Sequence, residues 1–451
     1  MTSRSGGTTV SPARRAAIDI LQRVEAGGAF ASVLIAAIPE SSLDQRDRAL
    51  AQELVLGVLR WRKALDYFIE RYGERTVGGL ELPVLMALRL GIYQLRYLSR
   101  IPASAAVNES VNLVRRARLG SAAGLVNAIL RRAARSLADA PGEGISDPLE
   151  KLAVEVSHPA WMLERWATAF GSAEAASLAL ANNQAPRAAF RINTLLSRSE
   201  QVMASLQRNG VNSSPSLIAT GAFVAEQGAA LGSSEPARRG WIYIQDEASQ
   251  VVSLALQVER GQRVLDLCAA PGSKTSHIAA LAGGDAMIVA CDLHLHRLAT
   301  LNSICKNLGA KCVSAVQLDA TRSLPLLAHA AKFDRVLVDA PCTGTGTLRE
   351  NPEIKWRLSP DDPNRIAGTQ FELLGRGAEV LETGGRLVYS TCSVEAEENE
   401  RVVVKFLEGG APFKIVKPEV SAGLMTADGF IRTFPHQHGC DGFFAAVLER
   451  R

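Results

Sequence analysis

Long apolar segments are missing from this sequence of 451 residues. No run of about 18 apolar residues could form a membrane-spanning helix, and the longest uncharged stretch, residues 209–225, is interrupted by Asn, Ser, Pro and Gly. The N-terminus also lacks the continuous apolar stretch of a secretory signal. We therefore expect no membrane association, and the odd number of cysteines, seven, favours a reducing cytoplasm.

Closely spaced cysteines and phosphate-binding glycine motifs are absent as well. No two cysteines are closer than seven residues, and His436 and His438 have no cysteine pair nearby, so we expect no metal. The sequence contains neither G-x-G-x-x-G nor a Walker A motif, which argues against NAD and ATP. A long heptad run is missing too, so we expect a monomer.

The residues that are present indicate a large globular protein with an uneven charge. Hydrophobic residues make up 47% and charged residues 21%, and the length predicts two or three domains. The net charge is only +4, but the first 135 residues carry 20 Lys/Arg against 11 Asp/Glu. Two explanations remain open for this basic part, a solvated helix face and a nucleic-acid-binding surface. Six arginines dominate its end: Arg115, Arg116, Arg118, Arg131, Arg132 and Arg135.

Periodicity divides the chain into three parts. From Pro12 to Arg135, apolar residues recur at helical spacing and predict an all-α bundle, followed by an acidic linker at 136–147. A short helix and a strand, AAFRIN, then indicate a small α/β subdomain. Beyond Trp241, apolar strands alternate with helices, as in a doubly wound, Rossmann-like α/β domain. The predicted domains are 1–140, 141–235 and 236–451.

Four predicted strands of the last domain end in aspartate, and ligands bind at the carboxyl ends of such strands. A single strand-end aspartate is usually structural, because Asp caps turns and helices. The small residues after Asp266 allow a ligand to approach the backbone, and Asp292 follows 26 residues later, near the offset at which an acidic residue holds a ribose. An adenosine cofactor without a pyrophosphate, such as S-adenosylmethionine, fits this pattern. The other two strand-end aspartates are Asp319 and Asp339.

Two cysteines, Cys342 and Cys392, follow predicted strands and so lie at the same edge of the sheet. They could be inert buried thiols, as we expect for Cys291, Cys305 and Cys312 in apolar surroundings. Beside a methyl donor they suggest another chemistry. Carbon 5 of cytosine is a poor nucleophile until a thiolate adds to carbon 6, and a second group must then help to remove the proton from carbon 5.

At these residues the chain resembles the RsmB/Sun family of RNA (cytosine-5)-methyltransferases. The resemblance rests on VLDLCAAPGSKTSHIAAL, DRVLVDAPCTGTGTLRENPEIKWR, LVYSTCSVEAEENE and RTFPHQHGCDGFFAAVLER. Upstream, RDRALAQELVLGVLRWR and GLVNAILRR are similar to the NusB-like RNA-binding domain of that family, and SHPAWMLERW and FRINT to its connecting subdomain. The resemblance covers nearly the whole chain.

The resemblance implies a role for each matching residue. Cys392, in the T-C motif, would be the nucleophile, and Cys342, in the P-C motif, would assist product release. Asp292 would bind the ribose, Asp319 would lie near the adenine, and Asp339 near the methionine end and the target base. The rest of the S-adenosylmethionine pocket would be the loop of Cys268, Ala269, Ala270, Pro271, Gly272, Ser273 and Lys274, with Lys274 ordering the loop through a carboxylate.

The resemblance therefore implies methylation of carbon 5 of a cytosine in small-subunit (16S) rRNA, with ribosomal RNA as the partner. An alternative from another class is a non-catalytic NusB-like RNA-binding or ribosome-assembly factor, which the basic first third would also suit. DNA cytosine-5 methylation is a third possibility, with Cys342 as the nucleophile, and the helical front end argues against it.

Overall fold

Leu, Ala and Arg at helical spacing form the helices predicted for the first part of the chain. The computed structural model describes residues 10–39, 41–322, 324 and 332–451 in two compact units. The first unit comprises Met1–Ala185 and Leu348–Arg357, and the second Pro186–Thr347 and Leu358–Arg451. The longer helices of the first unit are α1 (Pro12–Gly27), α2 (Ala31–Ala36), α3 (Gln45–Arg60), α4 (Arg62–Gly73), α5 (Leu82–Tyr97), α6 (Ala103–Arg116), α7 (Ala123–Arg135), α8 (Pro148–Glu155), α9 (Ala160–Phe170) and α10 (Ser172–Asn182).

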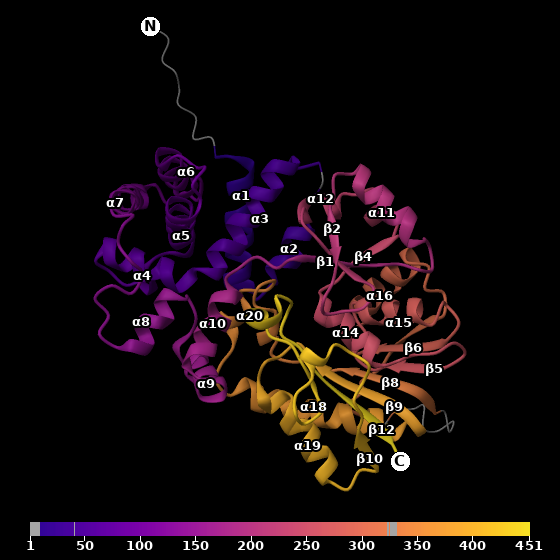
Figure 1. The fold of residues 1–451 in the computed structure, drawn as a ribbon. Helices are drawn as coiled ribbons and strands as arrows, with labels where there is room; N and C mark the ends of the chain where they lie inside the picture. The colour runs from indigo at the N-terminus through magenta and orange to yellow at the C-terminus, as the bar shows by residue number, and fades with distance from the viewer. Residues whose placement is uncertain (1–9, 40, 323, 325–331) are drawn as a thin grey trace. The chain divides into compact units, whose positions relative to one another are not determined.

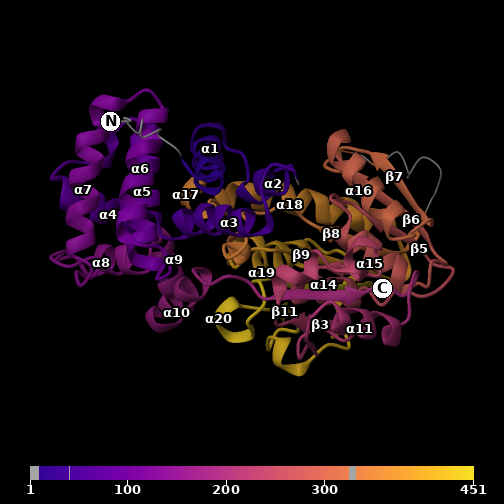
Figure 2. The same ribbon diagram turned by 90° about the horizontal axis from the view of Figure 1, so that it is seen from above.

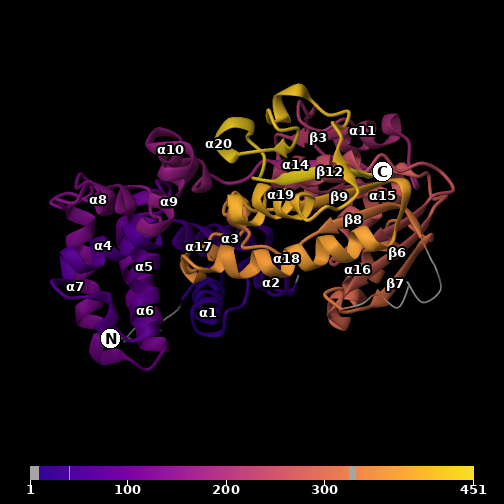
Figure 3. The same ribbon diagram turned by 90° about the horizontal axis from the view of Figure 1, so that it is seen from below.

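The predicted apolar stripes form the core of this bundle. Leu54 and Val58 on α3 and Leu65 on α4 are at most 1% exposed and belong to one hydrophobic cluster. Helices α4, α5, α6 and α7 pack against one another, as Figure 3 shows. The sequence thus places its apolar side chains on the inner faces, and the predicted all-α bundle is confirmed.

A second segment of the chain, residues 348–357, also belongs to the first unit and ends in the short helix α17 (Ile354–Arg357). Lys355 is buried, and its Nζ donates to the Arg60 carbonyl at 2.9 Å and to Asn183 Oδ1 at 3.0 Å. The indole of Trp356 donates to the Leu59 carbonyl at 2.7 Å. The chain therefore enters the helical bundle a second time, immediately after the predicted P-C motif.

The second unit begins with a small antiparallel sheet in the order β2-β3-β1-β4. Arg191 on β1 is buried and fixes this sheet to the rest of the unit, because its guanidinium donates to Gln245 Oε1 and Ser276 Oγ, each at 2.9 Å. The elements of this part are β1 (Ala188–Ile192), α11 (Ser199–Arg208), β2 (Ser213–Pro215), β3 (Ala222–Ala225), α12 (Gly228–Gly232), α13 (Glu235–Arg238) and β4 (Ile242–Ile244).

The main sheet has the strand order β10-β12-β9-β8-β5-β6-β7, and Figure 1 shows helices on both of its faces. Strands β9, β8, β5, β6 and β7 are parallel, and β12 runs antiparallel to β9. The strands are β5 (Arg263–Asp266), β6 (Met287–Asp292), β7 (Val313–Gln317), β8 (Phe333–Asp339), β9 (Leu381–Thr391), β10 (Phe413–Ile415), β11 (Ile431–Arg432) and β12 (Phe444–Arg450). The predicted Rossmann-like architecture is confirmed, and the antiparallel strand adds to it.

Alternate residues of the strands enter different cores because successive side chains point to opposite faces. Val264 and Val388 pack with helices α14, α15 and α16, whereas Leu265 and Tyr389 pack with α18 and α19. Figure 2 shows α16 beside β7 at the edge of the sheet. These helices are α14 (Glu247–Ala255), α15 (Ser273–Leu281), α16 (Leu295–Asn307), α18 (Asp362–Glu379), α19 (Glu400–Glu408) and the short α20 (Pro435–His438).

The alternation of apolar strands and helices predicts one helix around Gln370 to Leu381 and another from Leu298, and the structure shifts the bounds of both. The helix expected from Gln370 to Leu381 begins at Asp362, because Pro363 at the first turn supplies a favourable helix start, and it ends before Leu381, which begins β9. The helix expected from Leu298 begins one turn earlier, at Leu295. No helix in the described part of the chain is long and apolar enough to cross a membrane.

Candidate active site

Strand-end aspartates meet at one edge of the main sheet. Asp266, Asp292 and Asp339 are the last residues of β5, β6 and β8, and Asp319 lies two residues beyond β7. These parallel strands are neighbours, so their carboxyl ends lie side by side. Three of the four aspartates line one cavity of about 340 Å³, while Asp266 lies beneath it and is 1% exposed.

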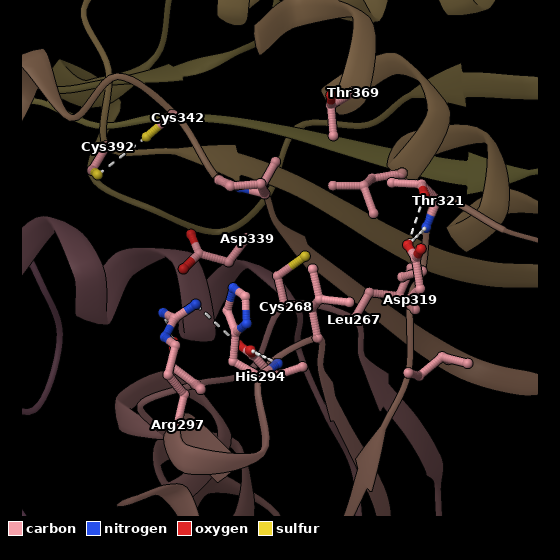
Figure 4. Close-up of a pocket in the computed structure, with 18 residues that line it drawn as sticks. Leu267, Cys268, His294, Arg297, Asp319, Thr321, Asp339, Cys342, Thr369 and Cys392 are labelled. Carbon is pink, nitrogen blue, oxygen red and sulfur yellow. Dashed lines mark hydrogen bonds and ion pairs between the residues drawn. The ribbon is translucent and has the colours of Figure 1, made fainter. Parts of the chain in front are cut away.

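Figure 4 shows this cavity with Asp319 and Thr321 at one end, the two cysteines at the other, and Asp339 between them. Apolar side chains cover much of its wall, and the carboxylates interrupt them. The lining residues are Leu267, Cys268, Ala270, Asp292, Leu293, His294, Arg297, Leu318, Asp319, Ala320, Thr321, Asp339, Ala340, Pro341, Cys342, Thr369, Leu373 and Cys392.

The structure places part of the loop between β5 and α15 on the cavity wall. Cys268 and Ala270 line the cavity, whereas Ala269, Pro271, Gly272, Ser273 and Lys274 are not among the lining residues. Gly272 has a φ of 109°, which favours glycine, and a Cβ atom there would lie 3.0 Å from the Leu301 side chain. The chain turns there into α15, and the side chains of its first turn enter the protein interior.

Lys274 is buried and bonds to Asp339, its Nζ donating to Oδ2 at 2.7 Å. Burial alone would lower the pKa of Lys274, but the Asp339 carboxylate and a smaller contribution from Cys392 outweigh it and raise that pKa. The other Asp339 oxygen accepts from Ser390 Oγ at 2.8 Å. The ammonium charge therefore lies close to both the carboxylate and the T-C cysteine.

The other two cavity carboxylates are held by their own loops. Asp292 Oδ1 accepts from the His294 backbone N–H at 2.9 Å, and Oδ2 lies 3.2 Å from Arg297. Arg297 also donates to the Ala270 carbonyl at 2.7 Å, which ties α16 to the loop before α15. Asp319 accepts from the Thr321 hydroxyl and N–H, and these hydrogen bonds lower the pKa of Asp319.

Cys342 and Cys392 meet at the end of the cavity, with 3.2 Å between their Sγ atoms. The register explains this approach: Asp339 of β8 is paired with Ser390 of β9, so the chains leaving both strands start at the same level. The hydrogen bond to Cys392, together with burial, raises the pKa of Cys342 well above its usual range. The two thiols are therefore within hydrogen-bonding distance, and either sulfur can be the donor.

The remaining cysteines occupy other environments. Cys291 and Cys305 are buried in the two cores of the main domain, and Cys312 packs against one of them, as predicted for small core residues. No group of three or more His, Cys, Asp or Glu residues in the described ranges is placed to hold a metal ion.

Several lining residues were missed by the sequence analysis. His294 and Arg297 follow a strand-end aspartate, and that position is a signal that could have identified them. Thr369 and Leu373 come from the middle of α18, where the sequence shows only a helical pattern. Their place on the cavity wall depends on how α18 packs against β8 and β9.

Three family profiles match the chain. Residues 253–449 match the 16S rRNA methyltransferase RsmB/F, residues 11–135 the NusB family, and residues 158–231 the RsmF/B-like ferredoxin-like domain. The chain is 31% identical to the "Probable ribosomal RNA small subunit methyltransferase B" of Bacillus subtilis, over 97% of this chain and 98% of the relative. It is 33% identical to the "Ribosomal RNA small subunit methyltransferase B" of Escherichia coli K12, over 97% and 98% of the two chains.

Solved structures share the fold. The crystal structure of PH0851 is similar over 98% of this chain and 99% of that chain, with 26% identity and a TM-score of 0.84. A methyltransferase homolog protein from Pyrococcus horikoshii is similar over 68% of this chain and 100% of that chain, with 28% identity and a TM-score of 0.60.

Proposed function

Because this chain belongs to the RsmB/F family of 16S rRNA methyltransferases, we propose that it methylates carbon 5 of one cytosine in small-subunit rRNA. The observation that carries the proposal is the pair of thiols, 3.2 Å apart, at the end of a cavity lined by three strand-end carboxylates. Cys392 is the nucleophile and Cys342 assists product release.

The cavity suits S-adenosylmethionine, which supplies an electrophilic methyl group when bound. Its apolar walls fit a purine, and the carboxylates at separate points fit the polar and cationic parts of that cofactor. Asp292 would hold the ribose, Asp319 would lie near the adenine, and Asp339 near the methionine end and the target base. The loop of residues 268–274 would complete the site, with Lys274 acting through Asp339.

The two thiols divide the chemistry between them. The Cys392 thiolate forms a bond to carbon 6 of the cytosine, which makes carbon 5 nucleophilic enough to take the methyl group. The proton on carbon 5 then leaves to a base, the electrons of that C–H bond re-form the double bond between carbons 5 and 6, and the Cys392 sulfur departs. Cys342, beside that sulfur, is placed to protonate it as it leaves.

The electrostatics favour this assignment of roles. The hydrogen bond to Cys392 and burial raise the pKa of Cys342, which suits a thiol that protonates the departing sulfur. Lys274 lies close enough to Cys392 for the sulfur to contribute to the raised pKa of that lysine, so a cation lies beside the reacting sulfur. The cytosine must leave its stack to reach these atoms.

RNA would bind to a basic face of α6, α7 and the segment between them, which we define by Arg115, Arg118, Arg131 and Arg135. None of these four arginines forms an ion pair with a described acidic residue, whereas Arg116 pairs with Asp19 at 3.4 Å. Between the two helices runs a groove of about 400 Å³ lined by Asn108, Val111, Asn112, Arg115, Ala123, Gly124 and Asn127. Guanidinium groups without an acidic partner among the described residues, beside amides, suit the phosphates and sugars of an RNA strand.

The first test is methyl transfer from labelled S-adenosylmethionine to unmodified small-subunit rRNA. The wild type should yield labelled 5-methylcytidine after nuclease digestion, and Cys392→Ala should yield none. Cys342→Ala should leave a covalent protein–RNA adduct that is visible on a denaturing gel. Cys312→Ala, a core cysteine, is the matched control and should behave as the wild type.

Two outcomes would overturn the proposal. Label in another nucleoside would exclude carbon 5 of cytosine as the methylated atom. Continued transfer by Cys392→Ala would exclude Cys392 as the nucleophile. RNA binding without any transfer by the wild type would instead support a NusB-like assembly factor.

A further inference from the structure

A buried carboxylate that the mechanism above does not use lies directly behind the two cysteines. Glu398 ends a short 3-10 helix, Ala396–Glu398, between Cys392 and α19, and its side chain is 0% exposed. Among the described residues, no Lys, Arg or His forms an ion pair with it. An unpaired buried carboxylate is costly unless hydrogen bonds replace the lost water, so its partners define its role.

Among the described residues, the hydrogen bonds of this carboxylate come from segments next to the cysteines and from Gln370 on α18. Oε1 accepts from the Thr343 backbone N–H at 2.8 Å and from Gln370 Nε2 at 3.2 Å, and Oε2 accepts from the hydroxyls of Thr343 and Ser393. Thr343 follows Cys342, and Ser393 follows Cys392. One carboxylate thus binds the residue immediately after each cysteine.

The neighbouring Asn399 extends this connection along the T-C loop. Its Oδ1 accepts from the Thr391 hydroxyl, and its Nδ2 donates to the Ser393 carbonyl at 2.9 Å. Thr391 and Ser393 flank Cys392 on both sides. Gln370 also donates to the Pro341 carbonyl at 2.9 Å, which holds the residue before Cys342.

We propose that Glu398 and Asn399 are positioning residues, which hold the loops of Cys342 and Cys392 in register so that both sulfurs reach the same base. This inference rests on the proposed roles of the two cysteines, because a single inert thiol would need no such alignment. Neither residue touches the cavity, so their effect on catalysis acts through Thr343, Ser393 and Thr391.

The proximity of the thiols can be measured without methyl transfer. Oxidised glutathione first forms a mixed disulfide with one thiol and releases one reduced glutathione; the second thiol then displaces the other glutathione, in a step whose rate depends on how often the two sulfurs meet. In the wild type, mass spectrometry should detect a Cys342–Cys392 disulfide that forms rapidly. Glu398→Gln should slow its formation at least about 10-fold, because the amide offers one oxygen where the carboxylate offers two.

The catalytic readout uses the same variants. Glu398→Gln should lower kcat by about 100-fold with KM for rRNA and the Kd for S-adenosylmethionine unchanged, since a misplacement of about 1 Å has effects of that size. Thr343→Val should also lower kcat, because it removes the hydroxyl that Glu398 accepts from. Thr343→Ser, which retains the hydroxyl, should have the kcat of the wild type. Glu247→Gln is the matched control: Glu247 is another buried carboxylate, which accepts from Ser216, just after β2, and from Arg187, just before β1.

The outcomes separate this inference from the proposed function. Disulfide formation at the wild-type rate in Glu398→Gln and in Thr343→Val, or equal slowing in Glu247→Gln, would overturn the positioning role. Slower disulfide formation without any methyl transfer by the wild type would support the alignment of the loops and refute the proposed reaction. If Glu398→Gln fails to fold, the comparison of Thr343→Val with Thr343→Ser tests the positioning role instead.

Discussion

The Nζ atom of Lys274, near the start of α15, lies 2.7 Å from Oδ2 of Asp339, the last residue of β8. The same carboxylate accepts from Ser390, two residues before Cys392. The ion pair and the Ser390 hydrogen bond therefore connect the start of α15 to both strands that lead to the cysteines.

Removing the ammonium should destabilise the fold. Lys274→Met retains the apolar stem but leaves the half-buried Asp339 charge without its cation, and we expect the free energy of unfolding to fall by about 1–3 kcal/mol. Urea unfolding monitored by circular dichroism measures it. Lys414→Met is the control, because its ion pair with Glu449 lies at the surface and should contribute little. Equal losses in both variants would contradict the structural role of Lys274.

Asp266 should make stability depend on pH. Burial, only partly offset by the hydrogen bond from Thr275, raises the pKa of Asp266 from 3.8 to about 7. Between those values the folded chain binds more protons than the unfolded chain, so the free energy of unfolding contributed by this group falls as pH rises and is constant above about pH 7.

Asp266→Asn should remove that dependence. The variant should be more stable than the wild type at pH 8, by at most about 4 kcal/mol, and closer to it at pH 5. Thr275→Val should have the opposite effect, because it removes the hydroxyl that favours the ionised carboxyl. If the difference in the free energy of unfolding between Asp266→Asn and the wild type were the same at pH 5 and pH 8, the raised pKa of Asp266 would be refuted.

The basic face should determine how RNA binding responds to salt. Replacing Arg115, Arg118 and Arg131 together by Gln should weaken RNA binding at low salt and lower the slope of log K against log salt by about 2, because each arginine on a phosphate releases counterions. Filter binding between 50 and 200 mM salt measures the slope. Arg401→Gln, on α19, should leave the slope unchanged, and an unaltered slope in the triple variant would place the RNA elsewhere.

Gly346 should tolerate no side chain. Its N–H donates to the Cys392 carbonyl at 2.9 Å, and a Cβ atom would lie 1.9 Å from the Gly442 carbonyl oxygen. Gly346→Ala should therefore displace the segment after Cys342, abolish methyl transfer and lower the melting temperature. Gly375→Ala, in α18 with no atom within 4 Å of the added Cβ, should be neutral or stabilising by about 1 kcal/mol. Full activity in Gly346→Ala would contradict the packing described.

Part of the site could be predicted because certain residues mark the ends of strands. Aspartate after an apolar run identified Asp292 and Asp339, and parallel strands bring such ends together whatever the details of the fold. The T-C and P-C motifs were predicted to lie at the same edge, and the register of β8 and β9 brings them to within hydrogen-bonding distance. The catalytic roles of these residues stay predictions.

Other features depend on packing between distant segments and leave no local signal. Thr369 is one of several polar residues on α18, and only the docking of that helix selects it for the cavity wall. Glu398 lies in an acidic stretch, EAEENE, that resembles a solvated turn, although its side chain is fully buried. Nothing in the segment LRENPEIKWR indicates that Lys355 is buried in the helical bundle.

The second entry of the chain into the helical bundle also governs how the protein can be divided. The polypeptide passes from one unit to the other at 185–186, at 347–348 and again at 357–358. A protease that cuts only the first of these junctions would therefore release neither unit. A gene fragment ending at residue 185 would encode a bundle without Lys355 and Trp356. The remaining fragment, residues 186–451, would carry the ten residues 348–357 that pack in the first unit. Each fragment would therefore lack, or carry in excess, the segment 348–357 that belongs to the first unit.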